Sequence, residues 1–148
     1  MIAVAMRPTT GRKYGTLSFA STLHLCPVID LLLADVPSQY QCEVRLGLQE
    51  ALVNAAKHGN KLDPSKTVLV QFFAFNDEYW WIIADQGTGF ASSSNQVKQC
   101  CCNTPGERGE CGRGLYILHQ VFDAVQWNAE GTELRLCKQF KRSALKLA

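Results

Sequence analysis

Long apolar runs and a strong excess of one charge are both missing from this sequence. Its 148 residues carry a formal net charge of +2, which is too small to indicate binding to nucleic acid or to an anionic membrane surface. The longest apolar stretches, YWWIIA and VIDLLLADV, are too short to span a bilayer. The first residues lack the charged segment that precedes the apolar one in a secretory signal. We therefore expect a cytoplasmic protein without direct contact to nucleic acid or membrane.

Internal repeats and long linkers are missing as well. Seven cysteines are present, three of them consecutive at Cys100, Cys101 and Cys102. Adjacent cysteines diverge in direction and chelate a metal poorly, and an odd number argues against a closed disulfide framework. Reduced thiols fit this pattern, with a redox-sensitive loop as the alternative. The length suits one domain over residues 1–148, of which we expect 1–13 to be loosely ordered.

The apolar patterns predict an α+β fold. An edge strand is expected first, Ser38 would be the N-cap of the second helix, and Asn76–Asp77 would form a hairpin turn. The order of elements predicts two layers, with helices on one face of a mixed, mostly antiparallel sheet. The expected elements are a strand over 14–20, two helices over 23–36 and 38–59, and a hairpin over 67–85. A third helix from near 114 and a second hairpin over 124–140 follow.

The helix predicted over 38–59 has a polar flank beside its core-facing stripe. Successive residues of an α-helix are about 100° apart, so Glu50 and Asn54 lie about 40° from each other. Gly47 lies one turn earlier and His58 one turn later. This flank suits the edge of a pocket, because it combines an acid, a carboxamide and an imidazole with a glycine that leaves space beside them. A solvated flank is the alternative, since polar side chains are mostly exposed.

Two glycine-containing motifs are candidates for ligand binding. In DQGTGF, Asp85 follows an apolar strand and can accept a hydrogen bond from a ligand amine, while the glycines allow close approach to the backbone. A plain strand-ending turn is the alternative. GECGRGL, residues 109–115, precedes the next helix, where free backbone amides and the helix dipole favour phosphate. It lacks the Gly-Lys-Ser/Thr ending of a P-loop and does not follow a strand.

The order of these motifs resembles that of the GHKL-type ATPases, and in particular the small anti-sigma factors that are also serine protein kinases. EALVNAAKHGN resembles the N box of this family, DQGTGF its first glycine box, and GRGLYILHQVFDAVQW its second. GTELRLCKQF resembles the closing strand pair. The resemblance extends from about Leu23 to Phe140. It implies the Bergerat fold, with an ATP lid over residues 91–108.

The resemblance also assigns a role to each matching residue. Glu50 resembles the general base, and Asn54 resembles the Mg²⁺ ligand, an oxygen donor suited to that hard ion. Asp85 would recognise the amino group of adenine, and His58 would be structural rather than catalytic. Gly87 and Gly89 would shape the adenine pocket. The phosphates would be held by Gly112, Arg113, Gly114 and Leu115, and Thr132 would help to hold the adenine. The chain departs from the family pattern around Arg108, which two acids flank, and at the triple cysteine.

The function that the resemblance implies is an ATP- and Mg²⁺-dependent kinase. It would phosphorylate a serine or threonine of a STAS-domain anti-sigma factor antagonist and sequester a sigma factor, and it could form a homodimer. A second hypothesis is a nucleotide-binding regulatory module that switches partner affinity without phosphoryl transfer. A third, the catalytic domain of a histidine kinase, requires a separate protein that carries the phospho-accepting histidine.

Overall fold

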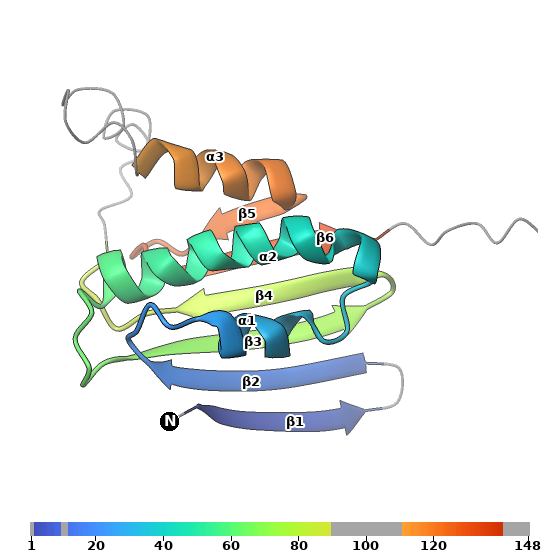
Figure 1. Ribbon diagram of the computed structural model, residues 1–148, viewed down its shortest axis with the longest axis horizontal. Coiled ribbons are helices and arrows are strands. Elements are labelled where there is room, and N and C mark those ends of the chain that lie inside the picture. The colour runs from blue at the N-terminus through green and yellow to red at the C-terminus, as the bar shows by residue number, and fades with distance from the viewer. Residues whose placement is uncertain (1, 10–11, 90–110, 141–148) are drawn as a thin grey trace, which may run out of the picture.

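A six-stranded sheet with helices packed on one of its faces forms the molecule (Figure 1). The computed structural model describes residues 2–9, 12–89 and 111–140. None of the helices within these ranges combines the length and apolarity that a bilayer crossing requires. The elements in chain order are β1 (Ala3–Thr9), β2 (Arg12–Ala20), α1 (Cys26–Leu33), α2 (Ser38–Val53), the π-helix η1 (Asn54–Gly59), β3 (Thr67–Phe75), β4 (Glu78–Ala84), α3 (Cys111–Val121), β5 (Ala124–Trp127) and β6 (Glu133–Gln139).

The strands are ordered β1-β2-β3-β4-β6-β5, and each of the five pairings between described strands is antiparallel. The predicted α+β fold, with two layers and helices on one face, is therefore confirmed. The sheet, expected to be mixed and mostly antiparallel, has no parallel pair among its described strands. Asn76 and Asp77 form the predicted hairpin turn, and their φ angles of 48° and 67° suit the two central residues of a type I′ turn.

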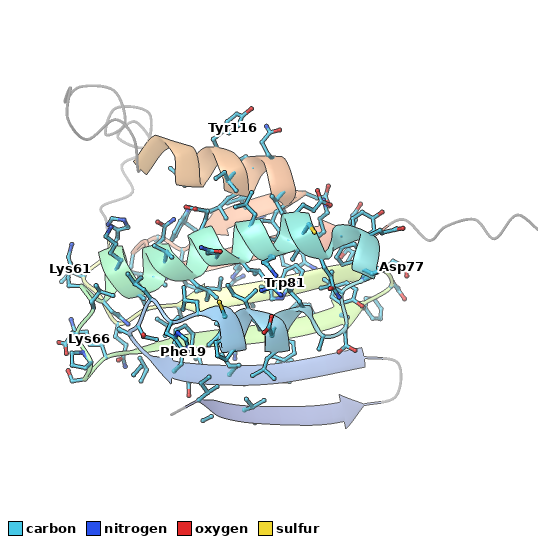
Figure 2. All side chains as sticks on the ribbon, viewed as in Figure 1. Phe19, Lys61, Lys66, Asp77, Trp81 and Tyr116 are labelled. Carbon is cyan, nitrogen blue, oxygen red and sulfur yellow. The ribbon has the colours of Figure 1, made fainter. Side chains whose placement is uncertain are left out.

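The core lies between the sheet and its helices. Alternate strand residues point to the same face, so one face of the sheet supplies apolar side chains to the helices. The apolar stripe of α2 packs against this face, as the sequence pattern predicts. Trp81 lies between the two layers (Figure 2). The largest fully buried side chains are Trp81, Leu17, Leu48, Leu52, Ile83, Leu118, Leu134, Leu136, Val28, Val44, Val68 and Val70.

The first strand corrects two predictions. Residues 3–9 form β1 and 12–13 begin β2, so the expectation of a loosely ordered segment over 1–13 is wrong for these residues. Residues 14–20 belong to β2, which is not an edge strand, because β1 covers its outer side in a register that pairs Ala3 with Ser18. Alanine, arginine and proline have low strand propensity, so the local signal is weak. Residues 3–9 form a strand because β2 supplies backbone hydrogen-bond partners along its outer side.

The helix boundaries also differ from the predicted ones. Pro37 occupies the N-cap position of α2 without a side-chain cap, and Ser38 is the first helical residue, so Ser38 is not the N-cap. Helix α1 is shorter than predicted, and Pro27 lies in its first turn. Helix α3 begins at Cys111 rather than near Gly114, so Gly112 and Gly114 lie inside its first turn.

The helix predicted as uniform over 38–59 changes its winding at Asn54. From Asn54 to Gly59 it is a π-helix, and the backbone N–H of Asn60 donates to the carbonyl of Ala55 at 2.9 Å, five residues earlier. The spacing of about 100° per residue therefore does not apply to His58. π-Helical turns are rare and are often found at functional sites.

The described cysteines are compatible with the reduced state expected from the sequence. Cys26, Cys42 and Cys137 are free, and burial raises the pKa of the Cys137 thiol to about 11. Cys137 is therefore a neutral core side chain at physiological pH. The triple cysteine at 100–102, the predicted lid over 91–108 and Arg108 lie outside the described residues.

Candidate functional site

A cavity of about 310 Å³ opens at the end of the sheet where η1 finishes. This volume lies within the range of small-molecule sites. Its wall is mostly apolar, with one carboxylate, one carboxamide and two basic side chains among the polar groups. The lining residues come from α2, η1, β4, α3, β5 and β6 and the turns beside them, and they are Ala51, Asn54, Ala55, His58, Gly59, Lys61, Ile83, Asp85, Thr88, Gly89, Leu115, Trp127 and Leu134. Such a wall suits a flat heteroaromatic ring with a few polar groups.

Asp85 supplies the carboxylate of this cavity. It follows the last residue of β4, and its backbone N–H donates to the carbonyl of Thr132 at 2.9 Å. Its Oδ1 accepts a hydrogen bond of 2.8 Å from the N–H of Gly87. Burial raises the pKa of the Asp85 carboxyl, against the smaller lowering effects of the Gly87 hydrogen bond and of Lys66. A partly buried acceptor in an apolar wall can discriminate strongly for a ligand N–H group.

Two neighbouring glycines make room for this carboxylate. A Cβ added at Gly59 would overlap the Asp85 carboxyl group, and one added at Gly87 would overlap the carbonyl oxygen of Gly59. Gly89 has a φ of +71°, and a Cβ there would overlap the carbonyl oxygen of Glu130. The structure thus gives a steric reason for the glycines at the two positions expected to shape the base pocket.

Thr132 lies behind the cavity and does not line it. Its Oγ1 accepts from Nδ2 of Asn128 at 3.1 Å, and its backbone N–H donates to Oδ1 of Asn128 at 2.9 Å. Its carbonyl oxygen is the acceptor for the N–H of Asp85. Thr132 therefore links the β5–β6 turn to the residue that carries the carboxylate.

Glu50, Asn54 and Gly114 come together beside the cavity. A Cβ added at Gly114 would lie 3.1 Å from Oε2 of Glu50 and 3.6 Å from Nδ2 of Asn54. Asn54 lines the cavity, whereas Glu50 lies beside it, one turn earlier on α2. The predicted acid and carboxamide therefore meet the N-terminal part of α3, where free amide groups and the helix dipole attract anions.

The remaining residues of the second glycine motif have separate places. Gly112 and Arg113 lie in the first turn of α3, and Leu115 lines the cavity. His58, predicted to be structural, is exposed and lines the cavity too. Within the described ranges, no three His, Cys, Asp or Glu side chains gather as metal ligands.

Sequence reasoning missed three residues around the cavity. Trp127 and Lys61 line it, and Asn60 is fully buried behind it. The tryptophan could have been found, because it closes a strand that pairs with the apolar β6. Asn60 gives no local signal, since an asparagine after His-Gly is equally typical of an exposed turn. Its burial depends on partners from three distant segments.

Comparisons with known proteins agree with this geometry. The family model described as histidine kinase-like ATPase domain matches residues 29–138. The serine-protein kinase RsbW of Bacillus licheniformis is 31% identical over 87 residues, which are 57% of this chain and 54% of that protein. RsbW of Bacillus subtilis strain 168 is 28% identical over 100 residues, which are 65% of this chain and 62% of that protein. The chain thus spans about half to three-fifths of the length of these curated relatives.

The family match includes the described parts of all three motifs that meet at the cavity, the N box and both glycine boxes. The match covers most of the chain and agrees with the antiparallel sheet covered by helices on one face. The protein is therefore a member of the GHKL-type, histidine kinase-like ATPase family.

Proposed function

We propose that the protein binds Mg-ATP and transfers the γ-phosphoryl group to a serine or threonine hydroxyl of a small protein. The observation that carries this proposal is the meeting of Glu50, Asn54 and Gly114 beside a cavity that both Asn54 and Asp85 line. A nucleotide would lie in this cavity. The names of the similar Bacillus proteins, which are serine-protein kinases, support the same reaction class.

The base would occupy the apolar part of the cavity. Asp85 would be the acceptor there for the exocyclic amino group of adenine. Gly87 and Gly89 let the turn after β4 pack directly on the carbonyl groups of Gly59 and Glu130, which shapes this part of the pocket. A guanine base carries a carbonyl oxygen at the same position, which the carboxylate would repel. The preference for ATP over GTP follows from this contact.

Phosphoryl transfer depends mainly on positioning and on neutralisation of charge. Glu50 would accept the proton of the attacking serine or threonine hydroxyl. The hydroxyl oxygen would form the new bond to the γ-phosphorus as the bond to ADP breaks. Asn54 offers an amide oxygen to Mg²⁺, which when bound neutralises charge on the phosphates. Gly112, Arg113, Gly114 and Leu115, at the start of α3, would hold the phosphates.

The partners proposed are a STAS-domain antagonist as the phosphate acceptor and a sigma factor that the protein sequesters. This part rests on the resemblance of the motifs to the anti-sigma factors of the family. A cytoplasmic location and a homodimer belong to the same proposal. The Glu-Arg-Gly-Glu sequence at 107–110 favours one alternative, a module that binds nucleotide and switches partner affinity without transfer, because its acids would repel a γ-phosphate.

One experiment separates the kinase from the regulatory module. The protein is mixed with labelled ATP, Mg²⁺ and candidate STAS-domain proteins, and label on the acceptor is measured beside equilibrium binding of ATP. Transfer to serine or threonine that Glu50→Gln abolishes is the expected result. ATP binding without transfer to any acceptor would establish the module instead. Failure to bind ATP at all would exclude both.

A further inference from the structure

Asn60 is a fully buried polar side chain at the junction between η1 and the cavity wall. It is 0% exposed, and in the described part of the chain only Ser21 is another buried polar residue. Its backbone N–H closes the π-helix by donating to Ala55. It does not line the cavity. Any effect of the Asn60 side chain on a ligand in the cavity must therefore be transmitted by the residues that Asn60 contacts.

The carboxamide of Asn60 uses both of its ends. Oδ1 accepts from the backbone N–H of Gln86 at 2.7 Å, while Nδ2 donates to Oγ of Ser21 at 2.8 Å and to the carbonyl of Thr67 at 2.9 Å. These partners fix the orientation of the amide, since only its nitrogen can donate to a carbonyl. One side chain thus ties together the end of β2, the start of β3 and the turn after β4.

Two further bonds support the same network. Oγ of Ser21 donates to the carbonyl of Lys66 at 2.9 Å, and the N–H of Thr67 donates to Oε1 of Gln86 at 2.8 Å. Gln86 is therefore held through its backbone and its side chain. Because Gln86 follows Asp85 directly, the peptide plane next to the cavity carboxylate is set by Asn60.

We propose that Asn60 is the positioning residue for base selectivity, an inference that rests on the proposed binding of ATP at Asp85. Without the Asn60 acceptor, the N–H of Gln86 loses its partner in a part-buried place, and the turn rearranges to find another. The Asp85 carboxylate then leaves the position from which it meets the amino group of adenine. Contacts to the phosphates, at the start of α3, stay intact.

The test compares ATP with purine riboside triphosphate, which lacks the 6-amino group. In the wild-type protein, the hydrogen bond to a charged acceptor should favour ATP by about 10- to 100-fold in Kd. Asn60→Ala should bring the two Kd values within about threefold by weakening ATP alone, since the analogue never uses this bond. In a protein that already carries Asp85→Asn, Asn60→Ala should not change the ratio of the two Kd values further, because the acceptor that Asn60 positions is already lost.

Ser21→Ala is the matched control, because it removes a partner of Nδ2 and leaves the Oδ1 contact to Gln86 in place. It should lower the Tm and keep the wild-type ratio. A folded Asn60→Ala protein that keeps the wild-type ratio would overturn the proposal for Asn60 while ATP binding stands. A wild-type protein that binds neither nucleotide would remove the proposed function and this inference together.

The wild-type protein gives a second readout if Asn60→Ala does not fold. The side-chain amide resonances of Asn60 and the backbone amide of Gln86 are followed by NMR in labelled protein. ATP should shift both sets of signals, and purine riboside triphosphate should shift them by less than half as much. Equal shifts with the two nucleotides would show that Asn60 does not sense the amino group, and would overturn the proposal.

Discussion

A methyl group at Gly114 would lie 3.1 Å from Oε2 of Glu50, so it would fit only if the Glu50 side chain shifted by a few tenths of an ångström. This contact joins the predicted phosphate-binding motif to the predicted general base. Residues 64 positions apart in the chain thus meet beside the cavity. The distance leaves no room for a larger side chain at position 114 unless the carboxylate moves.

Gly114→Ala should separate activity from stability. Alanine is favoured over glycine in a helix by up to about 1 kcal/mol, so the Tm should stay unchanged or rise slightly. The Glu50 carboxylate must shift by a few tenths of an ångström, so the phosphotransfer rate should fall, but by less than the roughly 100-fold loss of a misplacement of about 1 Å. Tyr116→Ala is the control on the same helix, because Tyr116 is 66% exposed and points away from the sheet (Figure 2). Full activity in Gly114→Ala would contradict the assigned role of Glu50.

Glu50→Gln should abolish transfer and leave nucleotide binding nearly unchanged. Loss of a general base lowers a rate by about 10²- to 10⁴-fold, whereas the amide keeps the size of the side chain. Single-turnover transfer and the Kd for ATP are measured on the same protein. Gln49→Ala, at the exposed neighbouring position, serves as the control. An equal loss of binding and transfer would mean that Glu50 acts in nucleotide binding rather than as a base.

Asn54→Ala should make ATP binding insensitive to Mg²⁺. In the wild-type protein we expect chelation of Mg²⁺ to weaken ATP binding, because Asn54 would help to hold the ion and the ion would neutralise charge on the phosphates. Asn54→Asp keeps an oxygen donor at this position and should keep the Mg²⁺ dependence. Titration calorimetry with and without chelator measures both. An unchanged Mg²⁺ dependence in Asn54→Ala would place the ion elsewhere.

Asp85→Asn should weaken ATP binding and stabilise the protein without ligand. The asparagine loses the charged acceptor for adenine but can still accept from the N–H of Gly87. It also removes a charge that burial disfavours. Thermal melts and binding titrations at neutral pH test the two effects. A lower Tm for this variant would show that the carboxylate is stabilising after all.

The pH dependence of stability has a defined sign at Asp85. Its folded-state pKa is raised above the ordinary value of 3.8, so the folded state binds the proton more tightly than the unfolded state. The contribution of this group to stability is complete below its unfolded pKa and is lost as the pH rises through the folded pKa. The difference in unfolding free energy between Asp85→Asn and wild type should therefore grow across this interval. A constant difference would contradict the raised pKa.

Trp127 should report nucleotide binding by its fluorescence. Of the three tryptophans, Trp127 lines the cavity, whereas Trp80 and Trp81 do not. ATP should therefore change the emission of the wild-type protein. The change should be lost in Trp127→Phe and kept in Trp80→Phe. An unaltered signal in Trp127→Phe would show that the base does not reach this wall.

Local patterns in the sequence were sufficient for much of the helix layer and for the hairpins. Leu48 and Leu52 are buried at the period expected of a core stripe, and Asn76–Asp77 forms the expected turn. The order of the motifs predicted one site for Glu50, Asn54 and Asp85; in the structure Asn54 and Asp85 line the cavity and Glu50 lies beside it. These features depend on residues close in the chain, where periodicity and turn chemistry act directly.

The parts that the sequence did not reveal depend on distant partners. Strand β1 forms because β2 offers it a backbone ladder. The burial of Asn60 requires β2, β3 and the turn after β4 at once. The change of winding at Asn54 has no marker among its neighbours, since alanine and lysine favour an ordinary α-helix.

The π-helical turn separates two asparagines that have different tasks. It begins at Asn54, which lines the cavity, and Asn60 closes it through the hydrogen bond to Ala55. With regular α-helical winding, the Asn60 side chain would be rotated around the helix axis by about 100°, the angle of one residue, and would point away from Gln86. The extra residue in this turn therefore sets the rotation at which Asn60 meets Gln86. Deletion of one residue from the turn should break the hydrogen bond between Asn60 and Gln86 and leave α2 in place.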